Sequence, residues 1–85
     1  MPNARGETKY GPQPIRVVLF ERGVPGSEFA DQIGINRLHV SKVNRGHIIP
    51  SQAYIDAACD ALALPADRLF SQEALNASYY RGVKR

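Results

Sequence analysis

The glycines at positions 34 and 46 most constrain the fold, because each follows an amphipathic segment and together they confine a helix to residues 37–45. Gly34 can adopt the left-handed conformation that often follows the last turn of a helix. Asn36 is a natural cap for the next helix, because its side-chain oxygen can accept a hydrogen bond from the free amide two or three residues further on. The sequence therefore predicts two short helices joined by a tight turn at Gly34.

The helix predicted over residues 37–45 has a thin apolar edge and a broad basic face. Val40 and Val43 lie three residues apart and share one side, where with Ile35 they would lock this helix against the preceding one. The other face carries side chains that nothing in the chain needs: Arg37, Leu38, Ser41, Lys42 and Arg45. A helix held by its back edge, with an exposed basic front, is suited to the major groove of duplex DNA, which is about 12 Å wide.

The rest of the chain indicates further short helices and no strand. Two segments with helical spacing of apolar residues precede Gly34. Ser51 is the expected cap of a fourth helix, whose apolar face continues to Leu62. Pro65 suits the first turn of a fifth helix, because its missing amide hydrogen is not needed there, and that helix could extend to about Tyr80. The predicted fold class is all-α, with five short helices.

Length and composition indicate one small globular domain. The chain has 85 residues, 44% of them hydrophobic, and its single cysteine excludes an intramolecular disulfide. No apolar run approaches the roughly 20 residues that a membrane-spanning helix needs. Residues 1–14 are polar and do not resemble a signal peptide. We therefore expect a cytosolic protein with no membrane partner.

Charge is segregated along the chain, although the net charge is only +3. No acidic residue lies between Asp31 and Asp56, whereas basic and imidazole side chains gather there, as a phosphate-binding surface requires. Residues 1–14, with three prolines and two glycines, are predicted to be a flexible basic arm. The predicted DNA-binding domain covers residues 15–73, and residues 74–85 form a C-terminal extension with a basic tail. The basic side chains of the two ends are Arg5, Lys9, Arg81, Lys84 and Arg85.

The segments EFADQIGINRLHVSKVNRG and ALALPADRLF, with the proline at position 50 between them, carry a family resemblance. From about Ile15 to Phe70 the chain resembles the Cro and phage-repressor family of helix-turn-helix proteins, also called the xenobiotic-response-element family. The resemblance implies a five-helix repressor-like fold and a homodimer bound to double-stranded operator DNA. It also implies a place in the cytoplasm of a bacterial or phage-infected cell, associated with the nucleoid.

The resemblance assigns roles to residues around the predicted turn. The base-reading positions of the family fall on Arg37, Leu38 and Lys42, with His39 and Ser41 as occasional contributors. Its phosphate-contacting positions fall on Gly26, Ser27, Asn36, Arg45, Gly46 and His47. Two roles remain open for Leu38, namely contact with a thymine methyl group or packing on the end of the second helix. Lys42 could contact either a base or a phosphate.

One pair of positions departs from the family pattern. Many members pair an arginine in the first helix with a glutamate near the end of the third, but the matching residues here are Leu19 and Asn44. Because apolar packing can often replace a partly buried ion pair at little cost, this departure does not change the expected fold. Leu75 and Tyr79 are candidates for the dimer interface, although they could instead cover the core of the monomer.

Other chemistry is not indicated. His39 and His47 lie eight residues apart with no cysteine nearby, so no metal site is expected, and Cys59 on an apolar face reads as a core residue. The chain shows no glycine-rich phosphate loop and no nucleophile–base pair, so we expect no enzyme and no cofactor. No small-molecule ligand is evident from the sequence, which leaves open whether an effector exists.

The function predicted from these features is sequence-specific transcriptional regulation by a repressor of phage or bacterial type, bound to a palindromic operator. Two alternatives remain. One is an antitoxin-type autorepressor with a toxin partner, which would need a longer partner-binding segment. The other is an architectural or recombination accessory protein, which would bind DNA with weak specificity and strong bending.

Overall fold

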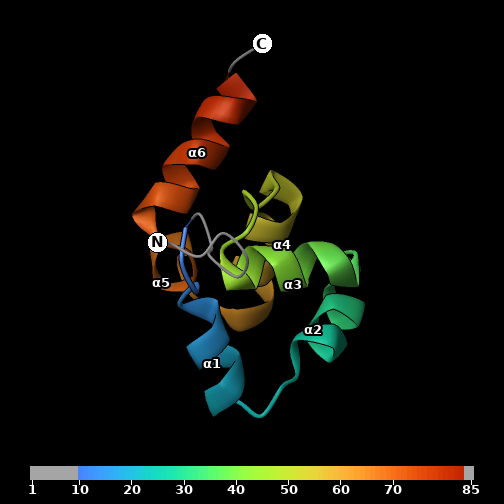
Figure 1. Cartoon of the computed structure of the whole chain (residues 1–85). Helices are drawn as coiled ribbons and strands as arrows, with labels where there is room; N and C mark the ends of the chain where they lie inside the picture. The colour runs from blue at the N-terminus through green and yellow to red at the C-terminus, as the bar shows by residue number, and fades with distance from the viewer. Residues whose placement is uncertain (1–9, 84–85) are drawn as a thin grey trace, which may run out of the picture.

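The amphipathic segments form short helices in the structure, a computed structural model that describes residues 10–83, with side chains described as far as residue 79 (Figure 1). The described residues form no strand, which confirms the all-α class. They form six helices: α1 (Ile15–Glu21), α2 (Gly26–Ile33), α3 (Arg37–Arg45), α4 (Gln52–Leu62), α5 (Ala66–Leu69) and α6 (Gln72–Val83). None of these helices has the length and apolar character needed to cross a membrane.

The predicted helix ends around the central turn are confirmed. Gly34 ends α2 with a φ of 73°, in the left-handed region. The side-chain Oδ1 of Asn36 accepts hydrogen bonds from the amides of Leu38 and His39, at 2.8 and 3.2 Å. At the start of α4, the Ser51 hydroxyl oxygen accepts the amide of Tyr54 at 3.1 Å. These local contacts set α2 against α3 and begin α4.

The single fifth helix that we expected is divided into α5 and α6. Phe70 has extended backbone, with φ −131° and ψ 149°, and its side chain is fully buried. Ser71 then starts a new helix, because its hydroxyl oxygen accepts the amide of Ala74 at 3.1 Å. Burial of the Phe70 ring and the cap at Ser71 therefore break the helix that periodicity alone would continue. Beyond the break, α6 extends away from the other helices (Figure 1).

The core is formed by buried side chains from α1 to α5, where α2 packs on α3 and α4, and α1 packs on α5. Val40 and Val43 are buried, which confirms that this edge of α3 faces inward. The ring of Tyr54 stands edge-on to that of Phe70, with the ring centroids 5.4 Å apart. Its hydroxyl donates a hydrogen bond of 2.6 Å to Oδ1 of Asn44, and burial raises the pKa of Tyr54 above its usual range. The tyrosine therefore connects the end of α3 to the core.

Part of the expected flexible arm, from Tyr10 to Gln13, packs against the end of α3. The amide of Tyr10 donates to the Gly46 carbonyl, and the amide of Gln13 donates to the Asn44 carbonyl, both at 2.9 Å. The last carbonyls of a helix have no partner within the helix, and this segment provides amide donors for two carbonyls at the end of α3. The basic arm residues Arg5 and Lys9 lie outside the described residues.

The boundary at the other end also differs from the predicted one. Ala74 and Ser78, which we assigned to the C-terminal extension, are buried, so the first turns of α6 belong to the domain. The two ends meet at Gln13, which is only 2% exposed. Its Oε1 accepts the amide of Ser71 at 2.8 Å, and its Nε2 donates to the Gly11 carbonyl at 3.0 Å. The tail side chains Arg81, Lys84 and Arg85 lie outside the described residues.

We expect Gln13→Ala to lower the free energy of unfolding by about 2–3 kcal/mol, because it leaves the buried amide of Ser71 without an acceptor and opens a cavity. Urea denaturation of the variant and the parent chain would measure this difference. Gln32→Ala is the matched control, since Gln32 is exposed on α2 and its removal should change stability by less than about 0.5 kcal/mol. Equal effects of the two substitutions would show that Gln13 does not join the two ends.

Candidate nucleic-acid interface

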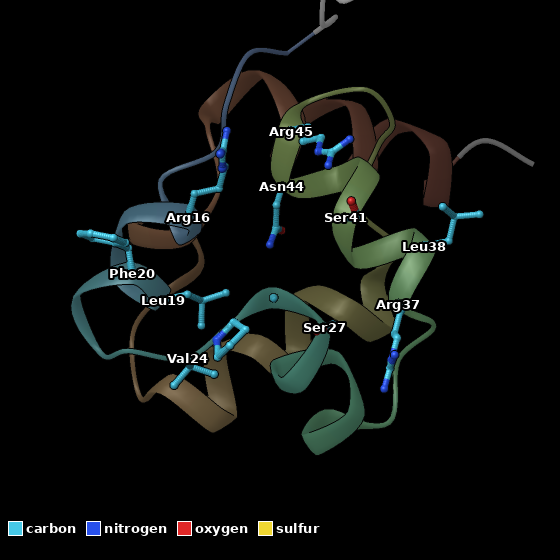
Figure 2. Close-up of a pocket in the computed structure, with 12 residues that line it drawn as sticks. Arg16, Leu19, Phe20, Val24, Ser27, Arg37, Leu38, Ser41, Asn44 and Arg45 are labelled. Atoms are coloured by element: carbon cyan, nitrogen blue, oxygen red, sulfur yellow. The ribbon is translucent and has the colours of Figure 1, made fainter.

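A groove of about 720 Å³ separates α1 from α3, with the start of α2 at one side (Figure 2). Its apolar wall is formed by Leu19, Val24 and Pro25. Six of the residues predicted to contact DNA also line it: Gly26, Ser27, Arg37, Leu38, Ser41 and Arg45. The fold therefore brings together base-reading and phosphate-contacting candidates from two helices around one opening.

The exposed face of α3 carries most of the predicted base contacts. Lys42 and Arg45 are exposed and Ser41 is half-buried, while Val40 and Val43 hold the opposite side in the core. Leu38 is 61% exposed, which leaves its side chain available to a partner molecule. This face has no acidic residue and is basic in the last turn of the helix.

Arg37 has a partner that the sequence did not reveal. Its Nε donates to one carboxylate oxygen of Asp31 at 2.9 Å, and its Nη2 donates to the other at 2.5 Å. The hydrogen bond from Arg37 lowers the pKa of Asp31, and the same bond raises the pKa of Arg37. Both side chains remain largely exposed, at 65% and 54%. The turn at Gly34 brings these two residues together, and their spacing of six residues is not one that marks a pair within a helix.

His39, which we expected to be an occasional base contact, packs toward α4. Its ring is half-buried and stands edge-on to that of Tyr54, with the centroids 5.8 Å apart. Its Nε2 accepts the amide of Ser51 at 3.2 Å. The imidazole therefore faces the start of α4 and connects it to α3, because position 39 lies between the buried and exposed sides of the helix.

The predicted phosphate contacts divide into available and occupied groups. α2 begins at Gly26 with no side-chain cap, so the amides that precede Phe29 in its first turn have no partner among the described residues. The Asn36 oxygen is used as the cap of α3. Gly46 is buried and its amide donates to the Val43 carbonyl at 2.9 Å, so this amide is already occupied. His47 is exposed beyond the end of α3.

Leu19 and Asn44, the two positions that depart from the family pattern, both line the groove. Leu19 is only 3% exposed, and Asn44 is 7% exposed. Figure 2 shows the nitrogen of the Asn44 side chain directed into the groove. The uncharged residues at these two positions are the sequence feature that corresponds to the groove.

The two candidates for a dimer interface lie in different surroundings. Leu75 is half-buried and packs against the core of the monomer, which was the alternative that we left open. Tyr79 is 64% exposed, so its side chain is accessible on α6. A dimer contact through this helix would therefore have to use Tyr79 more than Leu75.

Neither a metal site nor a reactive thiol stands out in the part of the chain that the structure describes. No group of three histidine, cysteine, aspartate or glutamate side chains there could hold a metal ion. Cys59 packs against the core, and burial raises the pKa of its thiol. Comparisons of the chain with protein-family models, with curated proteins and with solved structures gave no match.

Proposed function

We propose that this protein is a sequence-specific regulator of transcription that binds double-stranded DNA. In this proposal it acts as a repressor of phage or bacterial type and binds a palindromic operator as a homodimer, with α3 in the major groove. The observation that carries the proposal is the two-sided character of α3. Val40 and Val43 fix its back in the core, while Lys42 and Arg45 stand exposed on its front.

Electrostatics supports a polyanionic partner. Among the described residues, the pair of Arg37 and Asp31 is the one ion pair, so the charges of Lys42 and Arg45 are not neutralised within this range. Cations that replace condensed counterions on DNA phosphates supply much of the affinity for a duplex. Across the groove, the free amides at the start of α2 suit the same chemistry, because the positive end of the helix dipole favours a phosphate.

The arrangement of α2, Gly34 and α3 also resembles a helix-turn-helix. In that motif the second helix presents its first residues to base edges, and here those residues are Arg37 and Leu38. An arginine can present two donors to guanine, and a leucine can contact the methyl group of thymine. One such helix discriminates only a few base pairs, which is why the proposal includes a second copy of the chain.

The proposal is tested by selecting binding sites from a pool of random duplexes and then footprinting the selected site. We expect a two-fold symmetric sequence with half-sites about 34–36 Å apart, one turn of the double helix, and a complex with the mass of two chains. Failure to enrich any sequence, combined with strong bending of bound DNA, would favour the architectural alternative. Absence of binding to all duplexes at low salt would refute the proposal.

We expect Arg37→Ala to relax preference at one base pair of each half-site, at a cost of about 1–3 kcal/mol on the selected duplex and much less on other sequences. Asp31→Asn should relax the same base pair, because the guanidinium is then no longer anchored. The same change should raise affinity for unrelated DNA, because it removes a carboxylate beside the phosphates. Binding constants on the selected site and on its single-base variants would measure both effects. Uniform weakening by Arg37→Ala on every sequence would show instead that Arg37 contacts phosphate.

A further inference from the structure

The groove between α1 and α3 is larger and more apolar than contact with a DNA phosphate requires. Its volume of about 720 Å³ falls in the range of pockets that enclose small organic molecules. Leu19, Val24 and Pro25 form its apolar wall. A phosphodiester would need only polar groups at the rim, so the apolar wall indicates a ligand with an apolar body.

One polar group that lines the groove has no acceptor among the described residues. Asn44 is more than nine-tenths buried, and its Oδ1 is occupied by the hydroxyl of Tyr54 at 2.6 Å. Its Nδ2 points into the groove (Figure 2), and no residue within the described range accepts a hydrogen bond from it. Among the described residues no fully buried side-chain nitrogen or oxygen lacks a partner, so Nδ2 keeps access to water from the groove, and a ligand oxygen at this place would replace that water as its acceptor.

The surroundings of Asn44 favour a negatively charged oxygen. Gly26 and Ser27 line the groove at the uncapped start of α2, where the free amides and the helix dipole attract anions. Arg16 and Arg45 add two exposed positive charges on the α1 and α3 sides, and neither has an ion-pair partner among the residues described. Within residues 10–83, no acidic side chain lines the groove.

We propose that this groove binds a small organic anion. Its oxyanion head, a phosphate or a carboxylate, accepts hydrogen bonds from Nδ2 of Asn44 and from the first amides of α2. Its apolar body lies against Leu19 and Val24. Because Arg37 and Leu38 also line the groove, an occupant would obstruct the face of α3 that we assign to DNA. The binding itself stands without the proposed function, whereas its regulatory effect on DNA binding rests on that function.

The binding is tested by titrating the ¹⁵N-labelled chain with phenyl phosphate and following its amide spectrum. We expect saturable shifts of the Asn44 side-chain amide and of the backbone amides of Gly26 and Ser27, with benzoate acting on the same resonances. Inorganic phosphate and phenol each present one half of the ligand and omit one set of contacts. Each should therefore bind at least roughly tenfold more weakly than phenyl phosphate. Shifts that do not saturate, or that bypass Asn44, would overturn the proposal.

The substitution Asn44→Asp tests the contribution of the Nδ2 donor while leaving the rest of the site unchanged. The variant keeps an oxygen for the Tyr54 hydroxyl but replaces the amide nitrogen by a carboxylate oxygen, so phenyl phosphate should bind at least about tenfold more weakly. Asn76→Asp, on exposed α6, is the matched control and should bind as the parent does. If Asn44→Asp fails to fold, Gly26→Pro removes one first-turn amide at a helix position where proline is tolerated. Full affinity in either folded groove variant would overturn the proposal.

Competition with DNA gives the second arm of the test. Phenyl phosphate should displace the selected duplex, whereas inorganic phosphate at the same ionic strength should not. Saturable phenyl phosphate binding without displacement would overturn the regulatory effect alone. The same binding in a chain that binds no duplex would refute the proposed function and leave the anion site in place. Shifts of Asn44 by a duplex but not by phenyl phosphate would show that the groove holds a backbone phosphate, against the proposal.

Discussion

Gly46→Ala is expected to lower the free energy of unfolding by about 3–5 kcal/mol, a large part of the stability of so small a domain. Gly46 has a φ of 90°, which a residue with a side chain adopts only under strain. A Cβ atom there would lie 2.0 Å from the carbonyl oxygen of Gly11 and 2.6 Å from its carbonyl carbon. These are backbone atoms, so the chain before α1 would have to move and release the end of α3.

Gly23→Ala separates the two contributions to that decrease. Gly23 also has a positive φ, of 69°, but no atom lies within 4 Å of the Cβ that alanine would add. The substitution should therefore cost only backbone strain, on the order of 1 kcal/mol. Urea denaturation of both variants measures the comparison, with the slope checked for a change in the denatured state. Equal decreases in the free energy of unfolding would mean that the steric clash with Gly11 adds nothing to the cost of Gly46→Ala.

Features set by neighbouring residues were predicted from the sequence. Helix caps depend on contacts within a few residues, as at Asn36 and Ser51. The inward side of α3 leaves a periodic pattern of apolar residues, here Val40 and Val43. The all-α class follows from the same local signals. Gly46 was correctly predicted to end α3 for this reason, whereas its contact with Gly11 depends on a distant segment that has no such pattern.

Features that depend on tertiary packing were missed. A proline- and glycine-containing segment indicates a flexible arm, yet Gln13 is buried because Ser71 and the end of α3 offer it hydrogen bonds. The Asp31–Arg37 pair and the inward turn of His39 likewise depend on how α2 and α4 meet α3. The candidate contacts on α3 could be named from the sequence, but which of them remain accessible could not.

Lys42→Ala combined with Arg45→Ala is expected to weaken binding to every duplex by on the order of a hundredfold, because each side chain neutralises a phosphate. The slope of log K against log salt should fall by about 0.9 for each phosphate that is no longer neutralised. Both residues are exposed, and removal of their interaction with the helix dipole should cost only about 0.3–1 kcal/mol each, so the variant should remain folded. Titrations at several salt concentrations measure the affinity and the slope.

Arg68→Ala is the matched control for this experiment, because Arg68 is also an exposed arginine in the last turn of a helix, but lies on α5. Removal of its charge should change the salt slope by much less than the loss of one phosphate contact would. The control therefore distinguishes binding through a local basic surface from binding through the net charge of the chain. A decrease per charge equal to that of the double variant would mean that DNA binds through overall charge. Unchanged affinity of the folded double variant would place the DNA surface elsewhere, and the two-sided character of α3 would then need another partner to explain it.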